Sequence, residues 1–136
     1  GLDYTRGPVE YSFEKLKEIA SAENINNDIN NTISILENWK ARTGEAKPKM
    51  VIISVSGGGL SAAMYSMRVL QRADSLSGGQ LLKHTVLMTG ASGGTFATAL
   101  LRELYARKQM GLESNIYDEA FAYQLGRDLL NPICFT

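Results

Sequence analysis

The stretch that decides the fold is residues 85–94, which read Thr-Val-Leu-Met-Thr-Gly-Ala-Ser-Gly-Gly. Its first half is apolar and β-branched, which predicts a strand, and residues 95–104 continue with apolar side chains at helical spacing. A serine at the tip of a strand-to-helix turn has the geometry of a nucleophile elbow, which needs small residues two positions to either side. Gly90 and Gly94 meet this need, so Ser92 is the candidate catalytic residue. The competing interpretation is a glycine-rich turn whose serine caps the helix.

A second glycine-rich turn, formed by Gly57, Gly58 and Gly59, follows a continuous apolar run at residues 50–55. That run predicts a strand buried on both faces. Consecutive glycines expose backbone N–H groups, and the start of a helix adds positive potential, so the turn suits a phosphate or the oxyanion of a tetrahedral intermediate. The phosphate-loop and dinucleotide spacings are absent, which disfavours a nucleotide. A tight turn that only lets helix and strand pack closely is the alternative.

The order strand, glycine loop, helix, strand, elbow, helix predicts a βαβα unit with parallel strands, and hence an α/β fold. In such a unit both loops follow the carboxyl ends of their strands. They therefore lie at the same edge of the sheet, where the glycine donors fall beside Ser92. The expected strands cover residues 50–55 and 84–89, and the expected five or so helices cover residues 12–20, 25–39, 60–76, 95–110 and 117–130.

The chain divides at a polar linker over residues 41–49, which contains a glycine and a proline. We expect an N-terminal helical segment over residues 1–45 and the N-terminal portion of an α/β catalytic domain over residues 46–136. Two parallel strands leave edges and apolar faces uncovered. We therefore expect the domain to be truncated at its C-terminus, with the rest of the sheet elsewhere. Self-association through the uncovered sheet edges is a further expectation.

No residue in the chain is an obvious base for Ser92. A hydrolase triad of this type runs serine, acid, histidine, and no histidine follows Ser92. His84 lies at the far end of the preceding strand, about five residues away at roughly 3.3 Å each, which is too far. The two later aspartates, Asp118 and Asp128, have the spacing of helix-surface charges. A Ser-His-Asp triad within this chain is not expected.

The two turns together, Ser-Gly-Gly-Gly at residues 56–59 and Gly-Ala-Ser-Gly-Gly at residues 90–94, resemble the patatin-like phospholipase family. The resemblance covers residues 50 to about 105. It implies a three-layer α/β/α fold with a mainly parallel sheet. It also implies lipid acyl hydrolase activity through a Ser-Asp dyad.

By this resemblance Ser92 is the nucleophile, and Gly57, Gly58 and Gly59 supply the oxyanion hole. The sequence departs from the family pattern in two places. Ser61 stands where the family usually has arginine or lysine, which weakens recognition of a headgroup phosphate by this loop. The family's dyad aspartate lies in an Asp-Gly or Asp-Ala pair, and no such pair follows the elbow here.

These features predict a serine acyl hydrolase of the phospholipase or lysophospholipase type, whose aspartate lies beyond Thr136. The chain by itself is then expected to be inactive or nearly so. One alternative is an acyltransferase-like domain, such as a malonyl-transferase-like one, in which a downstream histidine partners the serine. The other alternative is a non-catalytic α/β module whose glycine loop holds a phosphate.

Composition limits the partners. Fourteen basic residues balance fourteen acidic ones, so no field attracts nucleic acid or an anionic membrane. There is no apolar run of about 18 residues to span a membrane, although peripheral contact fits a lipid ester substrate. The single cysteine, Cys134, excludes an internal disulfide. We expect no cofactor and no metal, and a cytoplasmic or membrane-associated location rather than a secreted one.

Overall fold

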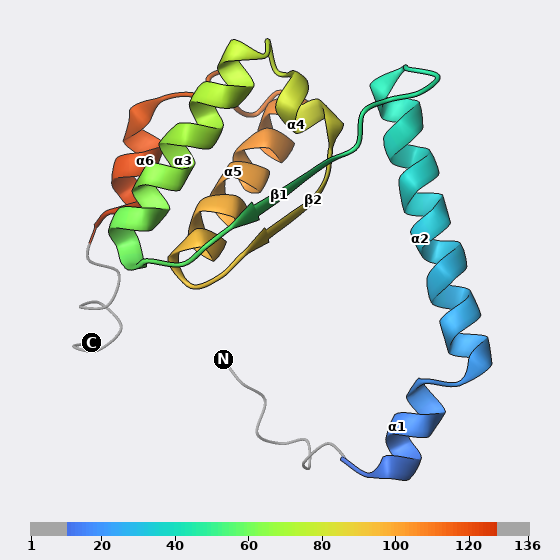
Figure 1. Cartoon of the computed structure of the whole chain (residues 1–136). Helices are drawn as coiled ribbons and strands as arrows, with labels where there is room; N and C mark the ends of the chain where they lie inside the picture. Colours follow the sequence, from blue (N-terminus) through green and yellow to red (C-terminus); the bar gives the residue numbers. More distant parts are fainter. Residues whose placement is uncertain (1–10, 128–136) are drawn as a thin grey trace.

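A computed structural model describes residues 11–127, and over this range the protein is a mixed α/β structure (Figure 1). Several elements agree with a local signal in the sequence, such as Ser12 and Ser21, which cap the first two helices. The elements are, in chain order, α1 (Phe13–Ile19), α2 (Ala22–Thr43), β1 (Val51–Val55), α3 (Gly59–Leu76), α4 (Gln80–His84), β2 (Thr85–Gly90), α5 (Gly93–Gln109) and α6 (Glu119–Leu125).

The two strands form a parallel sheet in the order β1-β2. The register pairs Val51 with Thr85 and Val55 with Gly90, with one irregularity after Val51. The predicted βαβα order and the parallel strand direction are therefore confirmed. Both strands end at the same edge of the sheet, and each is followed by its glycine-rich turn (Figure 1).

Helices cover one face of this sheet. Figure 1 shows α3, α5 and α6 on the same side of the strands, and the fully buried side chains of Met67, Leu101 and Ile116 lie in the core there. The opposite face carries Ile52 and Leu87, which are 59% and 49% exposed. The expected burial of the first strand on both faces is therefore wrong for the part of the chain that the structure describes.

Helix α2 is attached to the rest of the molecule near its C-terminal end. Trp39 and Thr43 are its buried residues, and it ends at Gly44, which adopts a left-handed φ of 71°. Towards its N-terminus, Ile25 and Ile29 are about half exposed. The linker expected from residue 41 begins only after Thr43, because the helix continues to its glycine cap. No helix between residues 11 and 127 has the length and apolar character needed to cross a membrane.

Two further elements differ from expectation. The short helix α4 (Gln80–His84) was not predicted, because one helical turn carries too little periodicity to be recognised. It takes His84 out of the strand, so β2 begins at Thr85. The last helix begins at Glu119, which leaves Tyr117 in the preceding loop, and Leu129 of its expected apolar face lies outside the described residues.

Candidate active site

Ser92 is exposed at the tip of the turn between β2 and α5. Its backbone has φ 48° and ψ −124°, and it is the only non-glycine residue of the described chain with a positive φ. Such a conformation costs on the order of 1–3 kcal/mol and persists only where the surroundings impose it. It is the strained strand-to-helix geometry of a nucleophile elbow. Ser92 occupies the N-cap position of α5, but its side chain makes no capping hydrogen bond, so the serine does not cap the helix through its hydroxyl.

Hydrogen bonds hold the turn on both sides of Ser92. The N–H of Ala91 donates to the carbonyl of Val55 at the end of β1 (3.0 Å), which ties the elbow to the neighbouring strand. The N–H of Thr95 donates to the carbonyl of Ser92 (2.9 Å), and its hydroxyl donates to the carbonyl of Gly90 (2.8 Å). Thr95 was missed by the sequence reasoning, although threonine near a helix start often makes such backbone bonds.

Gly90 and Gly94 have no room for a side chain, as the elbow predicts. A Cβ atom on Gly90 would lie 2.5 Å from the nitrogen of Thr95. One on Gly94 would lie 2.7 Å from the carbonyl oxygen of Ser56 and 2.8 Å from that of Val55. The first close approach lets the chain reverse within the elbow, and the second lets α5 begin directly against the end of β1.

The structure brings the glycine loop and the elbow into backbone contact. A Cβ atom on Gly57 would lie 3.1 Å from the Cβ of Ser92. One on Gly93 would overlap the carbonyl group of Gly59. Gly58 completes the loop with φ 147°, and Gly59 begins α3 with φ 73°; both lie in the region that favours glycine. Glycine is therefore required in this loop both for its positive φ angles and for its close contact with Ser92 and Gly93.

Several backbone N–H groups gather around the elbow without partners. None of the hydrogen bonds made outside helices and strands by residues 11–127 uses the N–H of Gly57 or Gly58. Gly93 opens α5, where the first N–H groups have no acceptor within the helix and the helix dipole is positive. Gly93 is a donor that the sequence reasoning did not name. The rule that the residue after the nucleophile contributes to the oxyanion hole could have found it.

His84 is engaged elsewhere, as its distance along the strand predicts. It is 8% exposed and lies at the end of β2 opposite to Ser92. Its Nδ1 lies 2.8 Å from the carbonyl oxygen of Gln80, and its Nε2 lies 3.0 Å from Oε1 of Glu45. Both ring nitrogens are thus occupied, Nδ1 within α4 and Nε2 in joining α4 to the segment after α2.

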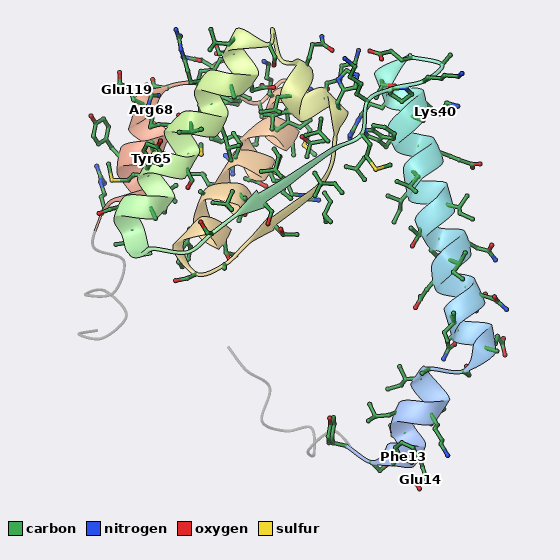
Figure 2. All side chains as sticks on the ribbon, in the orientation of Figure 1. Phe13, Glu14, Lys40, Tyr65, Arg68 and Glu119 are labelled. Carbon is green, nitrogen blue, oxygen red and sulfur yellow. The ribbon has the colours of Figure 1, made fainter. Side chains whose placement is uncertain are left out.

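The acids that follow Ser92 are engaged elsewhere too. Two of them form ion pairs: Glu103 with Arg107 (2.8 Å) and Glu119 with Arg68 (4.0 Å; Figure 2). The other two accept backbone hydrogen bonds: Glu113 from the N–H of Asn115 (3.0 Å), and Asp118, which caps α6, from the N–H of Ala120 (2.8 Å). Asp128 lies outside the described residues. Between residues 11 and 127 the Ser92 hydroxyl forms no hydrogen bond, so the described chain supplies it with no base.

One buried acid was not predicted. Asp74 is 1% exposed and accepts from the N–H of Leu82 (2.8 Å) and the hydroxyl of Tyr117 (2.8 Å). Burial, together with the hydrogen bond to Asp74, raises the pKa of Tyr117 to about 12. Asp74 lies fifteen residues after Gly59 in α3, a rise of about 22 Å at 1.5 Å per residue, so it is remote from the elbow. Its place on the apolar face of α3 was the available signal.

Comparison with models of known protein families, with curated proteins and with solved structures finds no match for this chain. The chemistry of this site is therefore inferred from the geometry of Ser92 and the glycine loop. Within residues 11–127 the structure shows an exposed serine on a strained turn, beside backbone N–H groups that make no hydrogen bond there. A serine and N–H donors in such an arrangement are suited to act as a nucleophile and an oxyanion hole.

Proposed function

We propose that this chain is the nucleophile-bearing part of a patatin-like serine acyl hydrolase. The observation that carries the proposal is the backbone of Ser92, strained at φ 48° and packed against Gly57. A turn that only joins a strand to a helix has no need of such a conformation. The proposed substrate is a lipid ester of the phospholipid or lysophospholipid type, in keeping with the resemblance of the two turns.

In the proposed reaction, the Ser92 hydroxyl attacks the ester carbonyl and its proton passes to an aspartate beyond Thr136. The developing oxyanion accepts hydrogen bonds from backbone N–H groups of the loop formed by Gly57, Gly58 and Gly59, with the N–H of Gly93 as a further donor. Collapse of the tetrahedral intermediate, with the proton passed from the aspartate to the leaving oxygen, releases the alcohol and leaves an acyl-serine. Water then attacks the acyl-serine and gives a proton to the aspartate, and return of that proton to the serine oxygen releases the fatty acid and restores the hydroxyl. The engagement of His84 with Glu45 supports an acidic partner over a histidine within this chain.

The open face of the sheet supports the proposed three-layer arrangement. Ile52 and Leu87 pair across the strands and are about half exposed, although large apolar side chains are usually covered. On the same face the hydroxyl of Thr89 donates to that of Ser54 (3.1 Å). A further helical layer over this face would complete the α/β/α fold, and we propose that it comes from outside this chain.

The test compares the complete protein that carries this sequence with its Ser92→Ala and Ser61→Ala variants, using a fluorophosphonate probe. Ser61 is an exposed serine at the start of α3 and serves as the matched control. We expect labelling of the wild type and of Ser61→Ala, and none of Ser92→Ala. Equal labelling of all three proteins would refute the proposal. Inorganic phosphate that raises the melting temperature equally in wild type and Ser92→Ala, without labelling, would instead favour the phosphate-binding module.

A further inference from the structure

A groove of about 760 Å³ runs along the free edge of β2. Four consecutive residues of the strand, Thr85 to Met88, line it, so it follows the strand rather than crossing it. One wall is the C-terminal half of α2 and the other is α5. Because β2 pairs only with β1 among the described residues, the backbone groups of β2 that face this groove have no strand partner there. Such an edge is a template for another strand.

The groove carries positive charge from both walls. Arg42 of α2 and Arg102 of α5 line it, both are exposed, and no acidic residue lines it with them. Neither arginine forms an ion pair with another residue in the range 11–127. Burial raises the pKa of Tyr105, which lines the same groove, while the charge of Arg42 acts to lower it. The electrostatics therefore favour an occupant that brings a carboxylate.

Trp39 adds an aromatic surface to the α2 wall of the groove. Its indole N–H is the only buried side-chain polar group between residues 11 and 127 without a hydrogen-bond partner. A buried donor in this state costs about 1–3 kcal/mol. Because this nitrogen is buried, Trp39 contributes ring surface to the groove and not an accessible donor.

We propose that this groove binds an extended acidic segment of a partner polypeptide, which adds a strand to β2 and places a carboxylate between Arg42 and Arg102. Backbone pairing along an open strand edge supplies affinity in this mode of recognition, and alternate side chains supply specificity. The site extends over Thr85 to Met88 and stops short of Ser92, so it does not involve the proposed catalytic residues.

A second copy of this chain fits the groove less well than an acidic peptide. Pairing two copies at β2 would bring both arginines of each copy into one interface without an acid from the groove lining. Like charges placed together in this way oppose association by several kcal/mol. The α2 and α5 walls of each copy would also have to pass each other before the two strand edges could meet.

Trp39 is the only tryptophan of the sequence, so its fluorescence reports directly on the groove. The probe is a short blocked peptide of alternating valine and threonine with one central aspartate, titrated into the full chain. We expect saturable binding. Binding should weaken about tenfold (about 1.4 kcal/mol) when the aspartate is replaced by asparagine, and should be lost when alternate backbone nitrogens on one edge are methylated.

Charge exchange makes the test specific. Arg102→Glu should bind the aspartate peptide about tenfold more weakly and should prefer the peptide with a central lysine. Arg102→Gln should weaken aspartate binding without gaining the lysine preference. Arg72→Glu, an exposed arginine of α3 outside the groove, should bind like the wild type. Circular dichroism of each variant checks that it is folded.

Three results would overturn the proposal. The first is that none of the peptides binds, and the second is that the aspartate and lysine peptides bind equally. The third is a dimer in light scattering that Arg102→Glu strengthens, which would assign the groove to a second copy. All of these outcomes are independent of labelling at Ser92, so the peptide site and the hydrolase proposal can fail separately.

Discussion

The carbonyl group of Gly59 occupies the position that a Cβ atom on Gly93 would need. One residue ends the glycine loop and the other follows the candidate nucleophile, so the contact joins the two halves of the site. Neither partner can move aside by a side-chain rotation, because the atoms in contact belong to the backbone. Any side chain at Gly93 must therefore push α3 and α5 apart at their first turns.

The first prediction follows from this contact. Gly93→Ala should lower the free energy of unfolding by about 2–3 kcal/mol, the upper part of the range for an overpacked core position. Gly111→Ala is the control: Gly111 has φ 73° and open space around its Cα, so alanine there should lose only about 1 kcal/mol from backbone strain. Urea denaturation followed by circular dichroism measures both. A Gly93→Ala protein as stable as the wild type would contradict the contact.

The second prediction concerns the strain at Ser92. Ser92→Gly should raise the free energy of unfolding by about 1 kcal/mol, because glycine adopts φ 48° and ψ −124° without a Cβ clash. Ser92→Ala keeps the Cβ and should leave the stability unchanged. Thermal melts of the three proteins under one condition give the comparison. If glycine proved less stable than alanine here, the turn would not be strained.

Thr95 provides a third prediction. Thr95→Val removes the hydroxyl that donates to the carbonyl of Gly90, and should lower the free energy of unfolding by about 1 kcal/mol. Thr95→Ser keeps the donor and should recover most of this loss. In the complete protein, the valine variant should also react more slowly with a fluorophosphonate, because the turn that presents Ser92 is less well fixed. Equal labelling rates in the two variants would show that the hydroxyl has no positioning role.

The fourth prediction concerns pH. The pKa of Tyr117 is raised in the folded protein from 10.0 to about 12, so the folded state favours its neutral form. Its contribution to stability is complete below pH 10 and is lost as the pH rises towards 12, because the unfolded state releases the proton first. Denaturation of wild type and Tyr117→Phe across this window should show a smaller alkaline loss in the variant.

The same substitution has an effect at neutral pH. Tyr117→Phe takes the hydroxyl away from Oδ2 of the buried Asp74, which should lower the free energy of unfolding by about 1–3 kcal/mol. Tyr123→Phe is the control, since Tyr123 is 60% exposed. Equal stability of the two variants at pH 7 would mean that the hydroxyl does not support Asp74.

Much of the α/β portion could be predicted because its signals are local. The apolar runs before each glycine turn predicted β1 and β2, and the βαβα order with parallel strands predicted that the turns meet at one edge. The need for glycine at positions 90 and 94 followed from the elbow alone. The contact of Gly93 with Gly59 could not be read in this way, because both residues look like ordinary helix-start glycines in the sequence.

The features that were missed depend on long-range contacts. Asp74 lies on the apolar face of α3, but its partners Leu82 and Tyr117 come from α4 and from the loop before α6, which the sequence does not place beside it. Gln71 likewise becomes buried only when its amide donates to the carbonyl groups of Ile116 and Asp118 (2.9 and 3.0 Å). Helix α4 is too short to show a period of its own. In each case the deciding partner lies elsewhere in the chain.

Because α2 is buried only at Trp39 and Thr43, a small rotation at this end produces a large displacement at the other end. Its 22 residues extend over about 33 Å at 1.5 Å per residue. A change of about 10° in its direction at Thr43 would therefore move the Ala22 end by about 6 Å. A pair of spin labels, one near Ile25 and one on α3, would convert small rearrangements in the β2 groove into distance changes that are easily measured. Binding of a ligand against Trp39 would then be measured as a change in this distance at the opposite end of the helix.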